Sequence, residues 1–148
     1  MAIQLYTIGF TRKTAEEFFG LLQTNGVQVV VDVRLKRDSQ LSGFAKGRDL
    51  PYFLKNLIDC DYCQNESMAP TPELLKRYRQ DKSWAQYEAD FNRLLYDRQL
   101  IVQLDRGWWA KNAACLLCSE HKPDHCHRRL IAEYMVAHWP EVEILHLM

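Results

Sequence analysis

The sequence predicts a single α/β domain in which about four mostly parallel strands lie between two layers of helices. Short runs of β-branched and apolar residues alternate with longer amphipathic segments, as in a parallel sheet with helical crossovers. No internal repeat and no linker divides the 148 residues, and this length is typical of one domain. We therefore expect residues 1–148 to form one three-layer unit.

Four segments predict buried strands. They are rich in Ile, Val and Leu, and they span Ile3–Ile8, Val27–Val33, Ala113–Ser119 and Val142–Leu147. A nearly continuous apolar run such as Val27–Val33 is typical of a strand that is covered on both faces. The first two strands and the helix between them predict a right-handed βαβ unit.

Helix start and stop signals lie between these strands. Thr14-Ala-Glu-Glu17 fits a capping box, and Asn25-Gly26 fits the end of the helix that it opens. Asp49 before Pro51 predicts the cap of a short helix that reaches about residue 58. Similar signals predict helices over 73–79, from Ser83, over 100–110 (with a strand over 100–104 as the alternative) and over 125–139.

Composition and charge argue against several classes of protein. The chain is 47% hydrophobic and 26% charged, close to the globular average, so a disordered or fibrous chain is not expected. Nineteen basic and nineteen acidic residues balance, which argues against a generally basic nucleic-acid binder. No apolar run is long enough to span a bilayer, and residues 1–10 lack the features of a signal peptide. These features predict a cytoplasmic protein without a membrane partner.

Five cysteines are many for a cytoplasmic protein, and an odd number argues against a disulfide framework. Two Cys-x-x-Cys pairs, at 60–63 and 115–118, call for a comparison with zinc sites. Cys115 and Cys118 fall on a predicted strand, where residues three apart point to opposite faces. A small zinc-stabilised domain therefore remains an alternative, with ligands drawn from Cys60, Cys63, Cys126 and His125 or His127. Our main interpretation uses no metal and no other cofactor.

The turn from the third predicted strand to the last long helix has the strongest chemical pattern. Cys118 and Glu120 end the strand, and Cys126-His127-Arg128 opens the helix. Free amides and the dipole at a helix N-terminus favour a thiolate, which makes Cys126 a candidate nucleophile. We expect Cys118 or Cys126 to be the thiolate, with His127 and Glu120 handling or orienting protons. The alternative is an inert buried cysteine beside ion pairs that only fix the loop.

Parallel strands place their carboxyl ends at one edge of the sheet, where ligands bind. This rule gathers Thr11 and Arg12, Asp32 and Arg34, and Arg128 at the same edge. The cations predict a small anionic ligand, phosphate-bearing or nucleotide-like, that these residues bind. A simple helix cap is the alternative for Thr11 and Arg12, and an internal ion pair is the alternative for Asp32 and Arg34.

Residues 34–48 are polar and contain five basic residues against one acidic residue, so they predict a long basic loop. A second functional hypothesis follows from it, namely a non-catalytic module that binds nucleic acid or a protein partner. The aromatic residues of the central helices are expected in the core and not on a base-stacking surface; they are Trp84, Tyr87, Phe91, Trp108 and Trp109. No oligomeric state is predicted.

Motifs spread over most of the chain occur together: Thr7-Ile-Gly9-Phe-Thr, Asp32-Val-Arg34, Ala69-Pro-Thr71-Pro-Glu73, Trp84-Ala-Gln-Tyr87-Glu, and Cys118-Ser-Glu120 followed by Cys126-His127-Arg128. Together they resemble a bacterial family catalogued as domain of unknown function 488. The resemblance implies a fold and a site at the last motif, but no reaction, because no activity is settled for the family. Its members often have a serine, a proline and an arginine after Asp-x-Arg. Leu35, Lys36 and Gln40 stand in this stretch here, so the resemblance implies no role for it.

Overall fold

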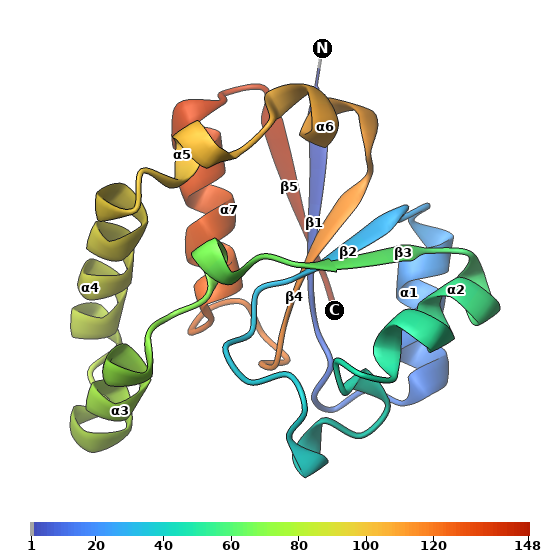
Figure 1. The fold of residues 1–148 in the computed structure, drawn as a ribbon, viewed down its shortest axis with the longest axis horizontal. Helices are drawn as coiled ribbons and strands as arrows, with labels where there is room; N and C mark the ends of the chain where they lie inside the picture. The colour runs from blue at the N-terminus through green and yellow to red at the C-terminus, as the bar shows by residue number, and fades with distance from the viewer. Residues whose placement is uncertain (1) are drawn as a thin grey trace.

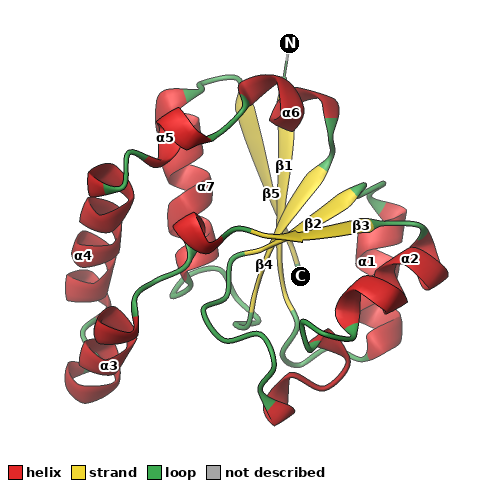
Figure 2. Ribbon diagram, in the orientation of Figure 1, coloured by secondary structure: helices red, strands yellow, loops and turns green. Residues whose placement is uncertain are grey.

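The computed structural model describes residues 2–148 as a parallel sheet with helices on both faces (Figures 1 and 2). The strands are β1 (Ile3–Gly9), β2 (Val29–Asp32), β3 (Asp61–Gln64), β4 (Ala114–Cys118) and β5 (Val142–Leu147). Their order in the sheet is β3-β2-β4-β1-β5, and all neighbouring pairs are parallel. The predicted three-layer α/β architecture is confirmed.

The predicted number of strands was too low by one. The missed strand, β3, has the polar sequence Asp-Tyr-Cys-Gln and lies at the edge of the sheet, paired only with β2. Its side chains alternate between exposed and half-buried, so it has no apolar run that would reveal it. After β3 the chain returns and places β4 between β2 and β1. The two strands of the predicted βαβ unit, β1 and β2, are therefore not neighbours in the sheet but lie on either side of β4.

Seven α-helices connect the strands within residues 2–148: α1 (Ala15–Thr24), α2 (Leu50–Ile58), α3 (Pro72–Asp81), α4 (Trp84–Asp97), α5 (Leu100–Gln103), α6 (Arg106–Lys111) and α7 (His127–His138). Two 3₁₀ segments, η1 (Gln40–Ala45) and η2 (Glu66–Met68), lie in the connections. Thus the predicted loop over 34–48 includes one short helical turn. None of the described helices is long and apolar enough to cross a membrane.

Local capping decides most of the helix starts. The capping box of α1 forms in both directions, with 3.1 Å from the Glu17 amide to Thr14 Oγ1 and 3.0 Å from the Thr14 amide to Glu17 Oε1. Asp49 is the N-cap residue of α2, as predicted, but its side chain accepts no capping hydrogen bond and lies 3.8 Å from Arg48 Nε. Residues 100–110 form two short helices, because Asp105 accepts from the amides of 107 and 108 and starts α6 there.

The apolar side chains form one core on each face of the sheet. The core beneath α1 and α2 contains Phe18, Leu54 and Cys115, whereas the core beneath α4 and α7 contains Phe91 and Cys118. Figure 1 shows the two helical layers on opposite sides of the strands. The prediction that the side chains at 115 and 118 point to opposite faces is thereby confirmed. The central aromatic residues lie in or against the α4 and α7 core, as expected.

Cys60 provides a test of burial on the α1 and α2 face. Burial raises the pKa of its thiol to about 12, whereas a free cysteine has a pKa of about 8.5. At pH values between these two pKa values, the Cys60 thiol is ionised in the unfolded chain but protonated in the folded chain. The contribution of Cys60 therefore lowers the free energy of unfolding as pH rises above about 8.5. We expect C60A to flatten the alkaline decline of the free energy of unfolding, measured by urea titration at several pH values.

Alkylation provides an independent check on Cys60. In the native protein we expect iodoacetamide to modify the exposed Cys63 well before the buried Cys60, as read by peptide mass spectrometry. Equal alkaline slopes for C60A and the unsubstituted protein, or equal labelling of the two thiols, would contradict the burial described here.

Candidate functional site

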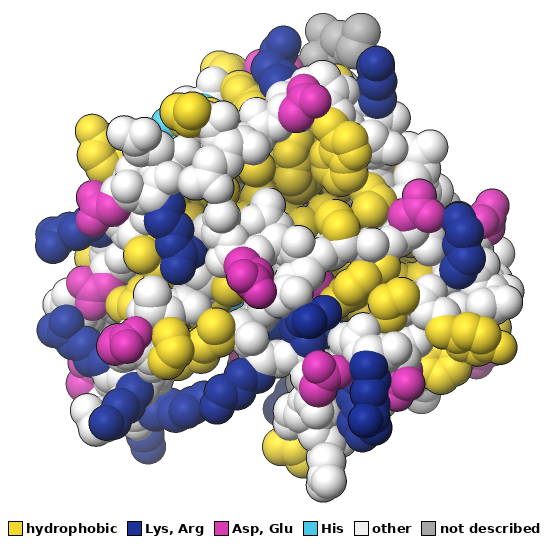
Figure 3. Space-filling model, in the orientation of Figure 1, with side chains coloured by type: hydrophobic (Ala, Val, Ile, Leu, Met, Phe, Trp, Pro, Cys, Tyr) yellow, Lys and Arg dark blue, Asp and Glu magenta, His cyan; other side chains and the backbone are white. Residues whose placement is uncertain are grey.

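A cavity of about 520 Å³ opens beyond the carboxyl ends of the strands. Its walls come from residues that follow β1, β2 and β4, from the start of α7, and from α3 and α4. Figure 3 shows Lys and Arg side chains on both sides of the notch at the lower edge of the molecule. The cavity therefore lies where ligands bind in open parallel sheets.

Two cysteines and a histidine meet at the wall of this cavity. Cys118 is the last residue of β4, Cys126 is the N-cap of α7 and His127 is the first residue of that helix. One ligand atom from each of the three lies within 4.8 Å of the others, and all three side chains are buried. The strand end and the helix start thus bring together residues that are eight and nine positions apart.

The hydrogen bond of His127 to Val33, the residue after β2, orients its ring. Nε2 lies 2.7 Å from the carbonyl oxygen of Val33, and Nδ1 lies 3.4 Å from Cys118 Sγ. Because a carbonyl oxygen only accepts hydrogen bonds, Nε2 carries a proton. Nδ1 is therefore the ring nitrogen that is free to accept a proton from, or return one to, the sulfurs.

The two thiols differ in their readiness to ionise. Burial opposes ionisation of Cys126, but its neighbours Cys118 and His127 and the positive charge of Arg128 together hold the pKa of Cys126 well below its usual range. The neighbouring sulfur of Cys126, together with burial, raises the pKa of Cys118. The arrangement thus favours a thiolate at Cys126 beside a protonated Cys118.

Arg128 fastens the β4–α7 turn to β1. Its guanidinium is fully buried and donates to Thr7 Oγ1 at 3.2 Å, to the Glu120 carbonyl at 2.5 Å and to the His121 carbonyl at 3.2 Å. No carboxylate of residues 2–148 lies within 4.0 Å of it, and Arg128 does not line the cavity. We therefore assign Arg128 to positioning the turn and to the positive potential near Cys126, and not to direct ligand contact.

The end of β1 approaches the same turn very closely. Gly9 pairs in register with Cys118, and a Cβ at Gly9 would lie 1.6 Å from the Glu120 carbonyl oxygen. Two residues later, the amide and hydroxyl of Thr11 both donate to the Ser119 carbonyl, at 3.1 and 2.8 Å. Thr11 lines the cavity, but its polar groups already bind this turn.

Arg34 is a buried cation with an incomplete set of partners. Its Nε and Nη2 donate to the two carboxylate oxygens of Asp32, at 2.9 and 2.7 Å, and Tyr62 also donates to that carboxylate at 2.6 Å. The guanidinium carbon lies 5.3 Å from the centre of the Phe10 ring. Nη1 has no hydrogen-bond partner among the described residues, although Arg34 lines the cavity. An unpaired buried donor destabilises a fold by about 1–3 kcal/mol, so a ligand that accepts from Nη1 recovers free energy.

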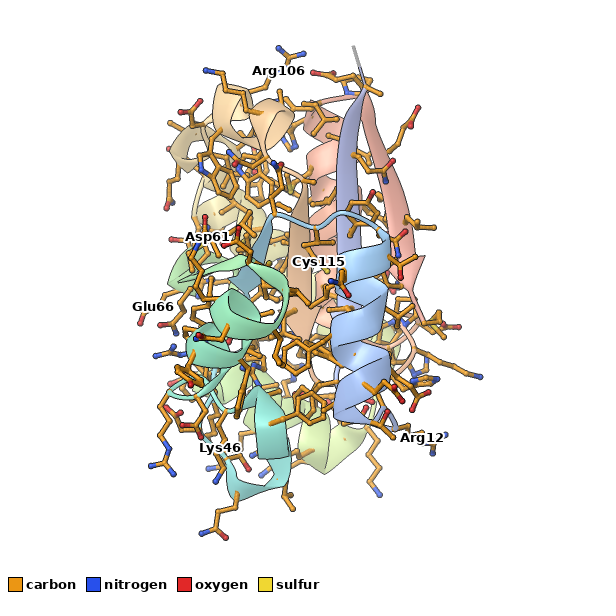
Figure 4. All side chains as sticks on the ribbon, turned by 90° about the vertical axis from the view of Figure 1, so that its right-hand side faces the viewer. Arg12, Lys46, Asp61, Glu66, Arg106 and Cys115 are labelled. Atoms are coloured by element: carbon orange, nitrogen blue, oxygen red, sulfur yellow. The ribbon has the colours of Figure 1, made fainter. Side chains whose placement is uncertain are left out.

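The remaining candidate residues occupy different places. Asp32 is buried, pairs with Arg34 and does not line the cavity, whereas Glu120 is exposed at the cavity wall. Arg12 is exposed in a left-handed conformation with φ 58°, outside the cavity, and Figure 4 shows it at the N-terminal end of α1. The structure therefore groups the two cysteines and His127 with Arg34 and Glu120, and it leaves Arg12 apart.

The zinc ligand set that was open in the sequence is not assembled. Cys60 lies in the core beneath α1 and α2, Cys126 lies in the core of the opposite face, and Cys63 is exposed. Within residues 2–148, the group with suitable spacing for a metal ion consists of Cys118, Cys126 and His127.

One wall of the cavity was missed by the sequence analysis. It comes from α3 and α4 and includes Tyr78, Arg79 and Trp84, with His125 stacked on the Trp84 ring at 5.0 Å between centroids. These helices belong to the long crossover between β3 and β4. The spacing of their apolar residues indicates only that one face of each helix packs against the core. No local signal separates an aromatic residue in the core from one that also borders a cavity.

Family comparison agrees with the motifs that form this site. The sequence profile described as Domain of unknown function DUF488 matches residues 14–135. The chain belongs to the DUF488 family. The matched range contains β2, β4, Arg34 and the Cys118–Arg128 turn, so most of the cavity of this DUF488 protein lies within it. No curated protein and no solved structure matched the chain.

The contact of Gly9 with the turn predicts a large effect of one methyl group. We expect G9A to destabilise the protein by at least the roughly 1–3 kcal/mol typical of overpacking, because its Cβ overlaps the Glu120 carbonyl. G20A is the matched control, since no atom outside its own helix lies within 4 Å of a Cβ there. In the interior of α1, alanine in place of glycine stabilises by about 0.5–1 kcal/mol. Urea unfolding measures both, and similar stability of the two variants would contradict the close approach.

Proposed function

We propose that this DUF488 protein is an enzyme-like domain that binds a small anionic ligand in the cavity and presents the Cys126 thiolate to it. One observation carries the proposal: the unpaired Nη1 of buried Arg34 belongs to a residue that lines the same cavity as Cys126. A cation with a free donor and a candidate nucleophile therefore border one volume.

Arg34 is the proposed anion anchor. Its planar guanidinium uses two donors on Asp32, which fixes its orientation, and leaves Nη1 for an oxygen of the ligand. Lys36 and Arg79 also line the cavity, against the single acidic residue Glu120. This excess of positive charge attracts anions toward the opening.

The β4–α7 turn is the proposed reactive centre. Cys126 lies at the N-terminus of a twelve-residue helix, where the free amides and helix dipole stabilise a negative sulfur. Cys118 and His127 adjoin it and are placed to hold or transfer a proton. Glu120, at the exposed wall, is the proposed group for orienting the ligand or accepting its proton.

Cavity size and lining support a phosphate-bearing or nucleotide-like ligand. About 520 Å³ lies within the range of roughly 300–1,000 Å³ that is usual for small-molecule sites. Phe10, Tyr78 and Trp84 line the cavity together with the cations, so apolar ring surface and positive charge are available to one ligand. A phosphate with an attached ring system matches this combination.

Iodoacetate tests the proposal, because it combines an electrophilic carbon with a carboxylate. For each thiol, we compare the alkylation rate with iodoacetate to the rate with neutral iodoacetamide. We expect this ratio of rates to be higher at Cys126 than at the thiol of free glutathione. R34K keeps a charge near Asp32 but removes the Nη1 donor. A charge-assisted hydrogen bond contributes about 1.5–3 kcal/mol, so we expect R34K to reduce this preference by at least about tenfold.

The matched control is R48K, which makes the same substitution at an exposed arginine of the same segment. Peptide mass spectrometry gives the alkylation rate at each thiol, and thermal melting verifies that both variants are folded. If the native protein shows no preference for iodoacetate, or if R34K and R48K behave alike, Arg34 is not an anion anchor for this thiol.

The structure supports the nucleic-acid or protein-binding hypothesis less well, because three arginines of residues 34–48 each contact a different protein group. Arg34 is buried against Asp32, Arg37 donates to Tyr62 at 3.1 Å and Arg48 lies beside Asp49. Thermal shift with inorganic phosphate and with a single-stranded oligonucleotide distinguishes the two hypotheses. Stabilisation by the oligonucleotide alone would favour the binding module.

A further inference from the structure

We propose that Cys118 Sγ, Cys126 Sγ and His127 Nδ1 form a binding site for a soft divalent metal ion such as Zn²⁺, with the fourth coordination position open to the cavity. This site uses a different ligand set from the zinc domain considered from the sequence. It concerns the same three side chains as the proposed function, and only its consequence for reactivity rests on that function.

The spacing of the ligand atoms matches tetrahedral coordination. Zinc binds cysteine sulfur at about 2.3 Å and histidine nitrogen at about 2.0–2.1 Å, which places a sulfur and a nitrogen ligand about 3.5 Å apart in a tetrahedron. The distance between Cys118 Sγ and His127 Nδ1 is 3.4 Å, and one ligand atom from each of the three residues lies within 4.8 Å of the other two. Small side-chain adjustments therefore suffice to bring all three onto one ion.

The ring of His127 is already oriented for this role. Metal-binding histidines usually donate their second ring N–H to a carbonyl or carboxylate, which fixes the tautomer and the direction of the lone pair. Here Nε2 donates to the Val33 carbonyl at 2.7 Å, so Nδ1 faces the sulfurs. Val33 follows β2, Cys118 ends β4 and Cys126 caps α7, so three separate elements position the ligands.

The number of ligands points to an open site and not a closed structural one. No fourth cysteine, histidine or acidic residue of the described chain joins the three. All three line the cavity, so water or an anionic group entering the cavity can take the remaining position. Structural zinc sites have four protein ligands, whereas sites with three keep one position for an exchangeable ligand.

Metal binding lowers thiol reactivity at this site. A thiolate sulfur that donates electron density to the ion is a weaker nucleophile toward a carbon electrophile. The metal would thus suppress the nucleophile of the proposed function while leaving the Arg34 anchor in place. An anion held by Arg34 could then supply the fourth ligand.

Titration of the reduced metal-free protein with Co²⁺ tests the site, because tetrahedral Co²⁺ with thiolate ligands has intense visible and charge-transfer absorption. We expect one Co²⁺ per chain with a tetrahedral spectrum, displaced by one equivalent of Zn²⁺. C118S and C126S should each weaken binding by more than the roughly 10- to 100-fold that follows loss of an outer-shell partner. C63S, which removes an exposed thiol, is the matched control and should bind as the unsubstituted protein does.

Alkylation of the unsubstituted protein avoids any doubt about folding of the variants. We expect saturating Zn²⁺ to slow the reaction of neutral iodoacetamide with Cys126 and to leave its reaction with exposed Cys63 unchanged. An octahedral Co²⁺ spectrum, binding that survives both C118S and C126S, or an unchanged Cys126 rate under Zn²⁺ would each overturn the proposal.

R34K separates this inference from the proposed function. We expect R34K to bind Co²⁺ with the stoichiometry and spectrum of the unsubstituted protein, because Arg34 is not a ligand. If the unsubstituted protein binds Co²⁺ but shows no preference for iodoacetate, the proposed function is contradicted and the metal site is not. If it prefers iodoacetate but does not bind Co²⁺, the metal site is contradicted and the proposed function is not.

Discussion

The buried guanidinium of Arg128 is the constraint on which the candidate site depends. A buried cation destabilises a fold unless its donors are paired, and here the partners are Thr7 on β1 and two carbonyls of the β4–α7 turn. The turn must therefore follow the path that brings those carbonyls to the guanidinium. Glycine at position 9 allows that path, because the Glu120 carbonyl occupies the space of a side chain there. Cys126 and His127 are consequently held beside the carboxyl ends of the strands.

A comparison of the two buried arginines distinguishes positioning from binding. Each nitrogen of the Arg128 guanidinium donates to a protein oxygen, and Arg128 does not line the cavity. Arg34 is anchored just as firmly, by both oxygens of Asp32, yet its Nη1 has no partner among the described residues. An unmatched buried donor is energetically unfavourable unless something binds it, and its presence on a residue that lines the cavity is the physical basis of the proposed anion site.

The cysteine and histidine cluster provides two kinds of chemistry from one geometry. A helix N-terminus, a nearby buried cation and a neighbouring thiol all stabilise negative charge on Cys126. The same stabilisation suits a thiolate that coordinates a metal ion, and His127 is oriented by Val33 for either role. The sulfurs and Arg34 line the cavity from different elements of the fold.

The sequence by itself determined four of the strands, most of the helix starts and the edge of the sheet where the candidate residues meet. These depend on local patterns: apolar runs for β2 and β4, and a capping box at Thr14 and Glu17. The tertiary structure alone decided the insertion of β4 between β1 and β2, the polar edge strand β3 and the wall from α3 and α4. It also decided that Arg128 binds carbonyls while Arg34 keeps a free donor. Backbone carbonyls and strand neighbours are brought together only by folding, so no residue type or spacing encodes which of them a buried cation will find.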